Sequence, residues 1–301
     1  MSDFAFGVDI GGTRVKAGLV DISKGEILSS KVFESAKNEE LFLSNLKNAL
    51  EVLRLSNGLE RRQICGAGVS VTGFVHSDGV MGRTSAAFLP FLSEYPIKKR
   101  LTETLEMPVR VDSDGRLVCY GECLFGAGRG YGRVLLITLG TGIGFCLLEN
   151  ATIPDYPAVL HMGGHIKVKN SDEKCYCGLT GCFEQLCSGP ALSRRFFEQT
   201  GLEKDGEAIF RMAENKDHDA MKLIDDYIED FCCGLNQFIY SHAPDVIIVG
   251  GGVAYGLKDY EDRIISGVTA KCYDVHHCDI RFAEMGDSAG ILGSAALFRQ
   301  N

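Results

Sequence analysis

The chain has 301 residues, 45% of them hydrophobic, and a formal net charge of −9. This length exceeds the usual size of one core, so two domains are expected, and the acidic balance without a long basic stripe argues against binding of nucleic acid. No apolar run approaches the roughly eighteen residues of a membrane span. The start lacks the basic region of a signal peptide, so we expect a cytoplasmic protein without membrane partners.

The first 125 residues predict an α/β domain. Strand-like apolar runs are broken by glycine-rich turns, and stretches with helical spacing lie between the later runs. Strands are expected at 4–10, 15–20, 27–33, 64–71 and 108–111, and helices at 38–56, 97–105 and 115–125. The first three strands follow one another directly and therefore form a β-meander that opens the sheet.

The turn after the first strand has the residue types of a phosphate site. Asp9 stands at the strand end, and Gly11 and Gly12 follow, whose missing side chains let backbone N–H groups approach an anion. Thr13 adds a hydroxyl donor. This chemistry suits a phosphate with its metal ion, but an ordinary Gly-Gly hairpin turn has the same short pattern, and both interpretations stay open at this point.

A second carboxylate, Asp114, lies where the strand at 108–111 passes into the helix at 115–125. Open α/β sheets bind ligands beyond the carboxyl ends of their strands, so the position suits chemistry. An aspartate at such a junction more commonly caps the helix, and the residues alone favour that role.

The second half of the chain repeats the pattern of the first. Predicted strands at 134–138 and 145–148 flank Gly140-Thr141-Gly142, so each half has a glycine-rich turn with a threonine. The pair is more specific than either turn and predicts a duplicated fold with phosphates held between the halves. Later, a buried strand at 245–249 runs into Gly250-Gly251-Gly252, where a flat ring or a ribose can approach the backbone. The remaining elements are expected at 191–198, 207–214 and 220–240 (helices), at 280–282 (strand), and in a closing helix that ends near residue 299.

One imidazole and three thiols lie close together in the sequence, at His165, Cys175, Cys177 and Cys182. These ligands saturate four-coordinate Zn²⁺ and leave no position for a substrate, which is typical of a structural site. The alternative is a set of unrelated cysteines in a chain that has twelve. Glu184 follows the last thiol closely, so a metal clamp would fix its direction, and it is a binding candidate.

In their order along the chain these motifs resemble the ROK (repressor, open reading frame, kinase) family, and the resemblance spans essentially the whole sequence. It rests on the Asp9 turn, Asp114, residues 139–144, the run Cys-x-Cys-Gly-x-x-Gly-Cys-x-Glu at 175–184, the glycines after Val249, and Asp287-Ser288-Ala289-Gly290. The resemblance implies an α/β fold of the actin-like ATPase (ribonuclease H-like) type, with duplicated β-meander sheets in two domains around a cleft. We expect residues 1–112 plus 290–301 in the first domain, and 113–289 with the zinc site in the second.

The resemblance also implies an activity, the ATP-dependent transfer of phosphate to a sugar hydroxyl, most often the primary one at carbon 6, with Mg²⁺ on the nucleotide phosphates. Asp114 falls where the family keeps its general base, which reverses the preference for a helix cap. Nucleotide and phosphate contacts are implied for Asp9, Gly11, Gly12, Thr13, Lys16, Gly140, Thr141, Gly142, Gly250, Gly251 and Gly252. Sugar contacts are implied for Glu184, His165, Ser113 and Asp114, and zinc ligation for His165, Cys175, Cys177 and Cys182.

The sugar side departs from the pattern of the family's glucokinases. Ser113 replaces an Asn, Met162 replaces a Glu, and Ala87 lies in a loop that usually has an Asn. A site built to hydrogen-bond a hydroxyl discriminates strongly, so these losses favour a different or less hydroxylated acceptor. The N-acylmannosamine kinases of the family also replace that Glu, so an N-acylhexosamine stays open, as do compensating contacts from His161 or Arg83.

A transcriptional repressor and a silent sensor are the two alternatives to a sugar kinase. DNA-binding family members carry an additional N-terminal helix-turn-helix domain, and here the first predicted strand begins at Phe4, which disfavours a repressor. A catalytically silent sugar or nucleotide sensor is motivated by the altered sugar residues, but the retention of Asp114 argues against it. The expected partners are a sugar and ATP, with a homodimer as a further possibility from the family.

Overall fold

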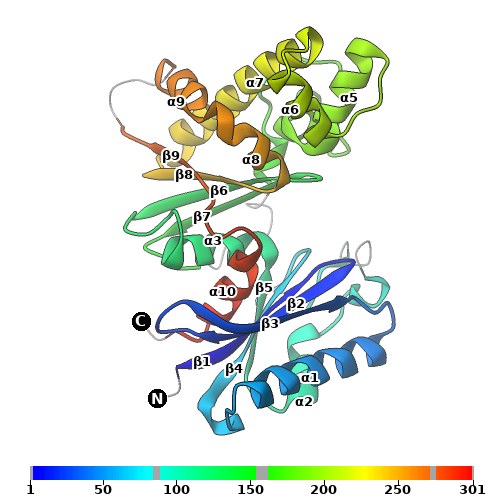
Figure 1. Cartoon of the computed structure of the whole chain (residues 1–301), viewed down its shortest axis with the longest axis vertical. Coiled ribbons are helices and arrows are strands. Elements are labelled where there is room, and N and C mark those ends of the chain that lie inside the picture. The colour runs from blue at the N-terminus through cyan, green and yellow to red at the C-terminus, as the bar shows by residue number, and fades with distance from the viewer. Residues whose placement is uncertain (1–2, 84–88, 154–161, 272–275, 300–301) are drawn as a thin grey trace. The chain divides into compact units, whose positions relative to one another are not determined.

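The computed structural model describes residues 3–83, 89–153, 162–271 and 276–299, which form two compact units (Figure 1). Unit 1 contains the described residues of 3–129, 151–153 and 285–299, and unit 2 contains those of 130–150, 162–271 and 276–284. The domain boundaries expected at 112/113 and 289/290 stay a prediction. In the structure the chain passes from unit 1 to unit 2 after Arg129 and returns to unit 1 at Met285.

Unit 1 is built on a five-stranded sheet in the order β3-β2-β1-β4-β5. The strands are β1 (Phe4–Ile10), β2 (Arg14–Asp21), β3 (Glu26–Glu34), β4 (Ile64–Val71) and β5 (Val109–Ser113). The helices are α1 (Glu39–Ser56), α2 (Ile97–Leu105), α3 (Asp114–Phe125) and α10 (Ala289–Ala296). The meander β1–β3 is antiparallel, whereas β4 runs parallel to β1 and β5 parallel to β4. These elements confirm the predicted ones to within a residue or two, except that α10 ends at Ala296, short of the predicted residue 299.

Strand alternation in β1 assigns its two faces to different helices. Phe6, Val8 and Ile10 join the core cluster that contains the buried residues of α1 and α2. On the other face, Ala5 packs with α10. A Cβ on Gly7 would lie 1.9 Å from the Ile291 carbonyl oxygen, so the helix backbone contacts the sheet directly. The glycines of this sheet thus position α10 close under the strand that carries Asp9.

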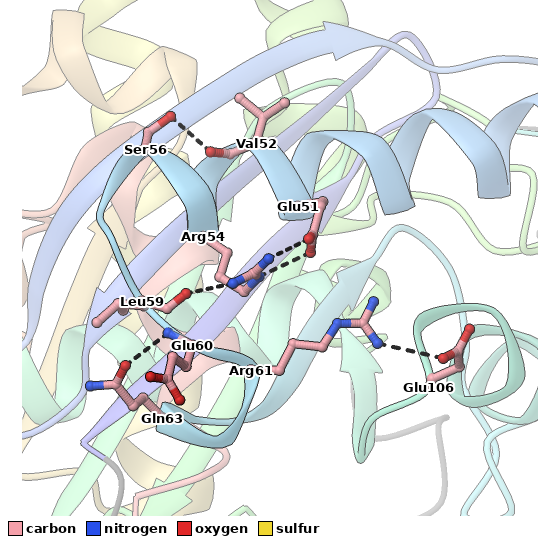
Figure 2. A network of polar contacts seen from close by, with 9 residues as sticks. All are labelled: Glu51, Val52, Arg54, Ser56, Leu59, Glu60, Arg61, Gln63 and Glu106. Atoms are coloured by element: carbon pink, nitrogen blue, oxygen red, sulfur yellow. Dashed lines mark hydrogen bonds and ion pairs between the residues drawn. The ribbon is translucent and has the colours of Figure 1, made fainter.

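Polar contacts hold the corner between α1 and β4 (Figure 2). The Arg54 guanidinium forms a two-pronged ion pair with Glu51 and donates a hydrogen bond of 2.6 Å to the Leu59 carbonyl oxygen. Arg61 lies 3.5 Å from Glu106 at the end of α2. These contacts fix where the chain leaves the helix and enters the buried strand β4.

Unit 2 is built on a four-stranded sheet in the order β7-β6-β8-β9. Its strands are β6 (Arg133–Leu139), β7 (Ile143–Glu149), β8 (Val246–Gly250) and β9 (Asp279–Phe282). Its helices are α4 (Phe183–Cys187), α5 (Gly189–Thr200), α6 (Gly206–Glu214), α7 (His218–His242), α8 (Gly252–Leu257) and α9 (Glu261–Thr269). Figure 1 shows α5–α9 gathered on one face of this sheet, where their buried side chains share one core cluster with β6 and β8.

The second unit repeats the first with a shorter meander. β6 and β7 are antiparallel, and β8 continues the sheet parallel to β6, as β4 does beside β1. Within the described residues the sheet has no strand corresponding to β3. Within the same residues no helix is both long enough and apolar enough to cross a membrane.

Candidate functional site

The turn between β1 and β2 carries the first group of predicted phosphate contacts. The Gly11 N–H donates 3.0 Å to the Arg14 carbonyl oxygen, which closes a tight hairpin and leaves Thr13 exposed. Lys16 follows on β2 and forms an ion pair of 2.8 Å with Asp287. Asp287 lies just before α10, so this ion pair connects the start of that helix to β2 within unit 1.

Two carboxyl groups of unit 1 lie in partly buried positions near this turn. Asp9, at the end of β1, accepts 2.9 Å from the Ser70 hydroxyl. Burial raises the pKa of Asp9, with a smaller contribution from Asp287, while Ser70 and Lys16 oppose the rise. A Cβ on Gly290 would lie 2.9 Å from the Asp9 Cγ, so the start of α10 needs a glycine to pack on this carboxyl group.

Asp114 is the first residue of α3, and Ser113 takes the N-cap position without a side-chain capping bond. The Asp114 carboxylate accepts 2.8 Å from the N–H of Gly115. Burial raises the pKa of Asp114, and the negative charge of Asp9 adds to the rise. The charge of Asp9 thus acts on Asp114, which indicates that the two carboxyl groups are near one another in unit 1.

The turn between β6 and β7 carries the second group of predicted phosphate contacts. The Gly140 N–H donates 2.9 Å to the Gly142 carbonyl oxygen, and the Gly140 carbonyl oxygen accepts 2.8 Å from Gly189 at the start of α5. Glu184, which is 8% exposed, accepts 2.8 Å from the Ile143 N–H. A Cβ on Gly142 would lie 2.6 Å from the Glu184 Oε2, so the turn packs directly against the predicted sugar-binding carboxylate.

The glycine run after β8 borders a cavity of about 710 Å³ in unit 2. Gly251 has a φ of 89°, and a Cβ there would lie 2.4 Å from the Leu139 carbonyl oxygen, whereas a Cβ on Gly252 would meet only open space. The volume is that of a small-molecule pocket. Its lining joins the two glycine segments to α5, α6 and α8, and comprises Gly140, Thr141, Gly189, Pro190, Ser193, Asp205, Gly206, Glu207, Phe210, Arg211, Glu214, Gly252, Val253, Tyr255, Gly256 and Asp259.

The four predicted metal ligands come together in unit 2. Their ligand atoms all lie within 4.8 Å of one another. The His165 Nδ1 is 3.4 Å from the Cys175 Sγ, and the Cys177 and Cys182 sulfurs are 3.6 Å apart. Zn–S bonds of about 2.3 Å in a tetrahedron put neighbouring sulfurs roughly 3.8 Å apart, so the donor set fits zinc in type and spacing.

The loop geometry explains this convergence. The Cys175 N–H donates 2.8 Å to the Leu179 carbonyl oxygen, and the Gly178 N–H donates 2.9 Å to the Cys175 carbonyl oxygen. Gly181 has a φ of 71°, and a Cβ there would lie 1.9 Å from the Lys169 carbonyl oxygen. Cys182 then begins α4, which positions Glu184 on its first turn.

The structure thus brings the predicted residues into separate groups, one in unit 1 and the others in unit 2. Of the altered sugar positions, Met162 accepts 3.0 Å from the His165 N–H through its carbonyl oxygen, Ser113 precedes α3, and Ala87 lies outside the described residues. Sequence reasoning missed the cavity residues of α5 and α6, such as Ser193 and Phe210. No local motif marks them, because they meet Gly252 only through the packing of distant helices.

Comparison with known proteins gives consistent results. A family model described as the ROK family matches residues 5–301. The chain is 28% identical to a glucokinase of Halalkalibacterium halodurans, with 100% of this chain and 96% of that protein covered. It is 25% identical to the N-acetylgalactosamine kinase AgaK of Shewanella sp., with 97% and 96% covered. The crystal structure of a ROK family glucokinase from Streptomyces griseus in complex with glucose and AMPPNP superposes with a TM-score of 0.77 at 27% identity, covering 99% of this chain and 100% of that one. These matches confirm the expected actin-like ATPase fold.

Proposed function

The chain belongs to the ROK family and is a carbohydrate kinase, and from this premise we propose that it transfers the γ-phosphate of ATP to the primary, carbon-6 hydroxyl of a hexose or hexose derivative. The observation that carries the proposal is the position of Asp114 at the junction of β5 and α3. Its carboxyl group is partly buried, and burial together with Asp9 raises its pKa.

Asp114 acts as the general base in this proposal. A carboxylate with a raised pKa is a stronger proton acceptor than a solvated one, and it remains ionised at neutral pH when the rise is moderate. Asp114 aligns the acceptor hydroxyl and takes its proton as the oxygen attacks the γ-phosphorus. Phosphoryl transfer needs little covalent help from the protein, so positioning and charge stabilisation do the rest.

The glycine turns hold the phosphates. The Gly12 N–H and the hydroxyls of Thr13 and Thr141 are donors suited to phosphate oxygens. Gly11 and Gly140, whose N–H groups close the two turns, have no side chain to keep a phosphate away from the backbone. The cavity beside Gly252 takes the adenosine. Bound Mg²⁺ would neutralise charge on the phosphates. Asp9 is suited to a position beside this ion, because its carboxyl group is desolvated and lies near a second carboxylate, Asp287.

The acceptor is held by Glu184, His165 and Ser113, together with Asp114. Glu184 offers one carboxylate oxygen, since its Oε2 already accepts from Ile143. His165 also binds zinc in this proposal, with Cys175, Cys177 and Cys182, and the metal fixes the loop that precedes Glu184. We further propose that the protein works in the cytoplasm, and that the homodimer known from the family is formed here too.

A second candidate acceptor is an N-acylhexosamine. Two features support it, the apolar Met162 in place of a polar sugar contact and the likeness to an N-acetylgalactosamine kinase at 25% identity. The N-acyl group replaces one hydroxyl of the sugar, so it needs one hydroxyl contact fewer.

A panel assay tests the activity and separates the acceptors. Purified protein with Mg-ATP should release ADP with at least one of a set of hexoses, N-acylhexosamines and cyclitols. Preference for N-acetylated sugars over the parent hexoses would select the second candidate. Silence across the panel, with nucleotide binding retained in calorimetry, would contradict kinase activity and indicate a sensor.

A further inference from the structure

The metal loop presents a tyrosine whose position packing does not explain. Tyr176 stands between Cys175 and Cys177, in the turn that the Cys175–Leu179 hydrogen bond closes. The residue is 74% exposed. A large aromatic residue so exposed adds little to the core, so its position calls for another explanation.

The hydroxyl of Tyr176 contacts the imidazole of His165. Its oxygen lies 3.0 Å from the His165 Nε2, and the two rings meet edge to face, with centroids 4.9 Å apart and planes at 89°. The other ring nitrogen, Nδ1, faces the Cys175 sulfur. Nε2 is therefore the nitrogen that remains to bind a sugar hydroxyl, and the tyrosine hydroxyl already holds it.

We propose that Tyr176 is a specificity-determining residue, whose hydroxyl occupies the hydrogen-bonding position of the His165 Nε2 and must be displaced by any acceptor that presents a non-reacting hydroxyl there. The inference rests on the proposed function, because it takes His165 as an acceptor contact. Displacement costs one hydrogen bond but little packing, since the ring is exposed. The favoured substrate class is a hexose derivative in which the hydroxyl at this place is absent or replaced.

Calorimetric titration of the full-length, zinc-loaded protein with D-glucose and its mono-deoxy analogues, without nucleotide, tests this. In Tyr176→Phe the Kd for D-glucose should fall by about tenfold, because the hydrogen bond between the tyrosine hydroxyl and the His165 imidazole no longer opposes binding. The Kd of the analogue that lacks the displacing hydroxyl should not change. Tyr240→Phe is the matched control, since it removes the hydroxyl of another exposed tyrosine of unit 2, bonded to the Lys271 carbonyl oxygen.

Zinc content and melting temperature distinguish a structural role. Tyr176→Phe and Tyr176→Ala should both keep the wild-type zinc content and both bind D-glucose more tightly. An unchanged or higher Kd in both variants, or loss of zinc, would overturn the inference while leaving the kinase activity of the wild type intact. If the wild type itself releases no ADP with any sugar, the proposed function fails and the inference fails with it.

Discussion

In the proposed mechanism the chemistry depends on Asp114, whose surroundings are unusual for a helix start. A carboxylate at the first turn of a helix normally gains from the helix dipole, which lowers its pKa. Here burial and the charge of Asp9 outweigh the hydrogen bond from the Gly115 N–H, and the pKa of Asp114 rises. The group is therefore tuned to accept a proton, which a cap does not need.

Asp114→Asn should leave the affinity for Mg-ATP nearly unchanged and lower kcat by about 10²–10⁴-fold, the contribution of a general base. Asparagine keeps the hydrogen-bonding shape but cannot take the proton. Steady-state kinetics and nucleotide titration measure the two effects. Asp78→Asn is the control, because it makes the same charge change in a turn of unit 1 and should keep the wild-type kcat. An unchanged kcat in Asp114→Asn would refute the role of this residue.

The same variant should alter stability in a pH-dependent way. The pKa of Asp114 is raised in the folded protein, so this group stabilises the fold below its unfolded pKa and loses that contribution as pH rises through the folded pKa. At pH 7 Asp114→Asn should therefore melt at a higher temperature than the wild type. The difference should shrink as pH falls towards 4. A lower melting temperature at pH 7 would contradict the sign of the pKa shift.

Among single residues, the sequence allowed prediction of those whose partners lie close to them along the chain. The four metal ligands lie between His165 and Cys182, with glycines that permit the turns, so their convergence was predictable, and zinc itself stays a prediction. The contact of Tyr176 with His165 was not predictable, because position 176 carries no pattern of its own. For Asp114, the residues alone favoured a cap, and the structure gives the cap position to Ser113.

Among the elements, α10 has the closest contact with the sheet of unit 1. A Cβ on Gly68 of β4 would lie 1.7 Å from the Ser294 carbonyl oxygen. The added atom would clash with the backbone of α10, so no flexible side chain could move aside to relieve the clash. The Ser294 hydroxyl also contacts the Val8 carbonyl oxygen at 3.2 Å. The helix therefore lies directly on β1 and β4, beneath the carboxyl group of Asp9.

Gly68→Ala should destabilise unit 1 by about 1–3 kcal/mol or more, the usual cost of overpacking a close contact. Chemical denaturation followed by circular dichroism measures the change. Gly82→Ala is the control, since the atoms nearest its Cβ, in Phe74 and His76, would lie at ordinary distances of 3.4 Å or more, and it should keep the wild-type stability. Equal stabilities of the two variants would show that α10 can move away without cost.

The predicted elements were those with a long periodic pattern or a buried strand. Three short helices of unit 2 were not predicted: α4, α8 and α9. α8 begins at Gly252, contains Gly256 and has no side-chain cap, and α4 has five residues, so neither offers the usual signals. α9 also lacks a side-chain cap, and its apolar residues are few. Tertiary packing against α6 and α7 forms these helices more than local preference does.

At the scale of the whole molecule, we expect the stability of the two units to depend on metal to different extents. The ligand cluster lies entirely within unit 2, and its loop leads directly into α4, which packs against α7. Because thiolate ligands bind metal only in the folded arrangement, binding free energy becomes folding free energy. Unit 1 has no corresponding cluster among its described residues.

Cys177→Ser should lower the melting temperature of unit 2 by several degrees and leave that of unit 1 unchanged. A strong chelator should bring the wild type down to the same value and have little effect on the variant. Differential scanning calorimetry with metal analysis checks both, with one zinc per chain expected in the wild type. Cys278→Ser, which changes a thiol outside the cluster, should keep the metal. Absence of zinc from the wild type would refute the metal assignment.

The hydrogen bond from Ile143 to Glu184 has a consequence for how the two substrates bind. The carboxylate proposed to read the sugar is anchored to the backbone of the turn proposed to hold the phosphates, so an occupant of either place fixes the conformation that the other requires. Donor and acceptor should accordingly bind with positive cooperativity, each lowering the dissociation constant of its companion by the same factor, as linkage demands.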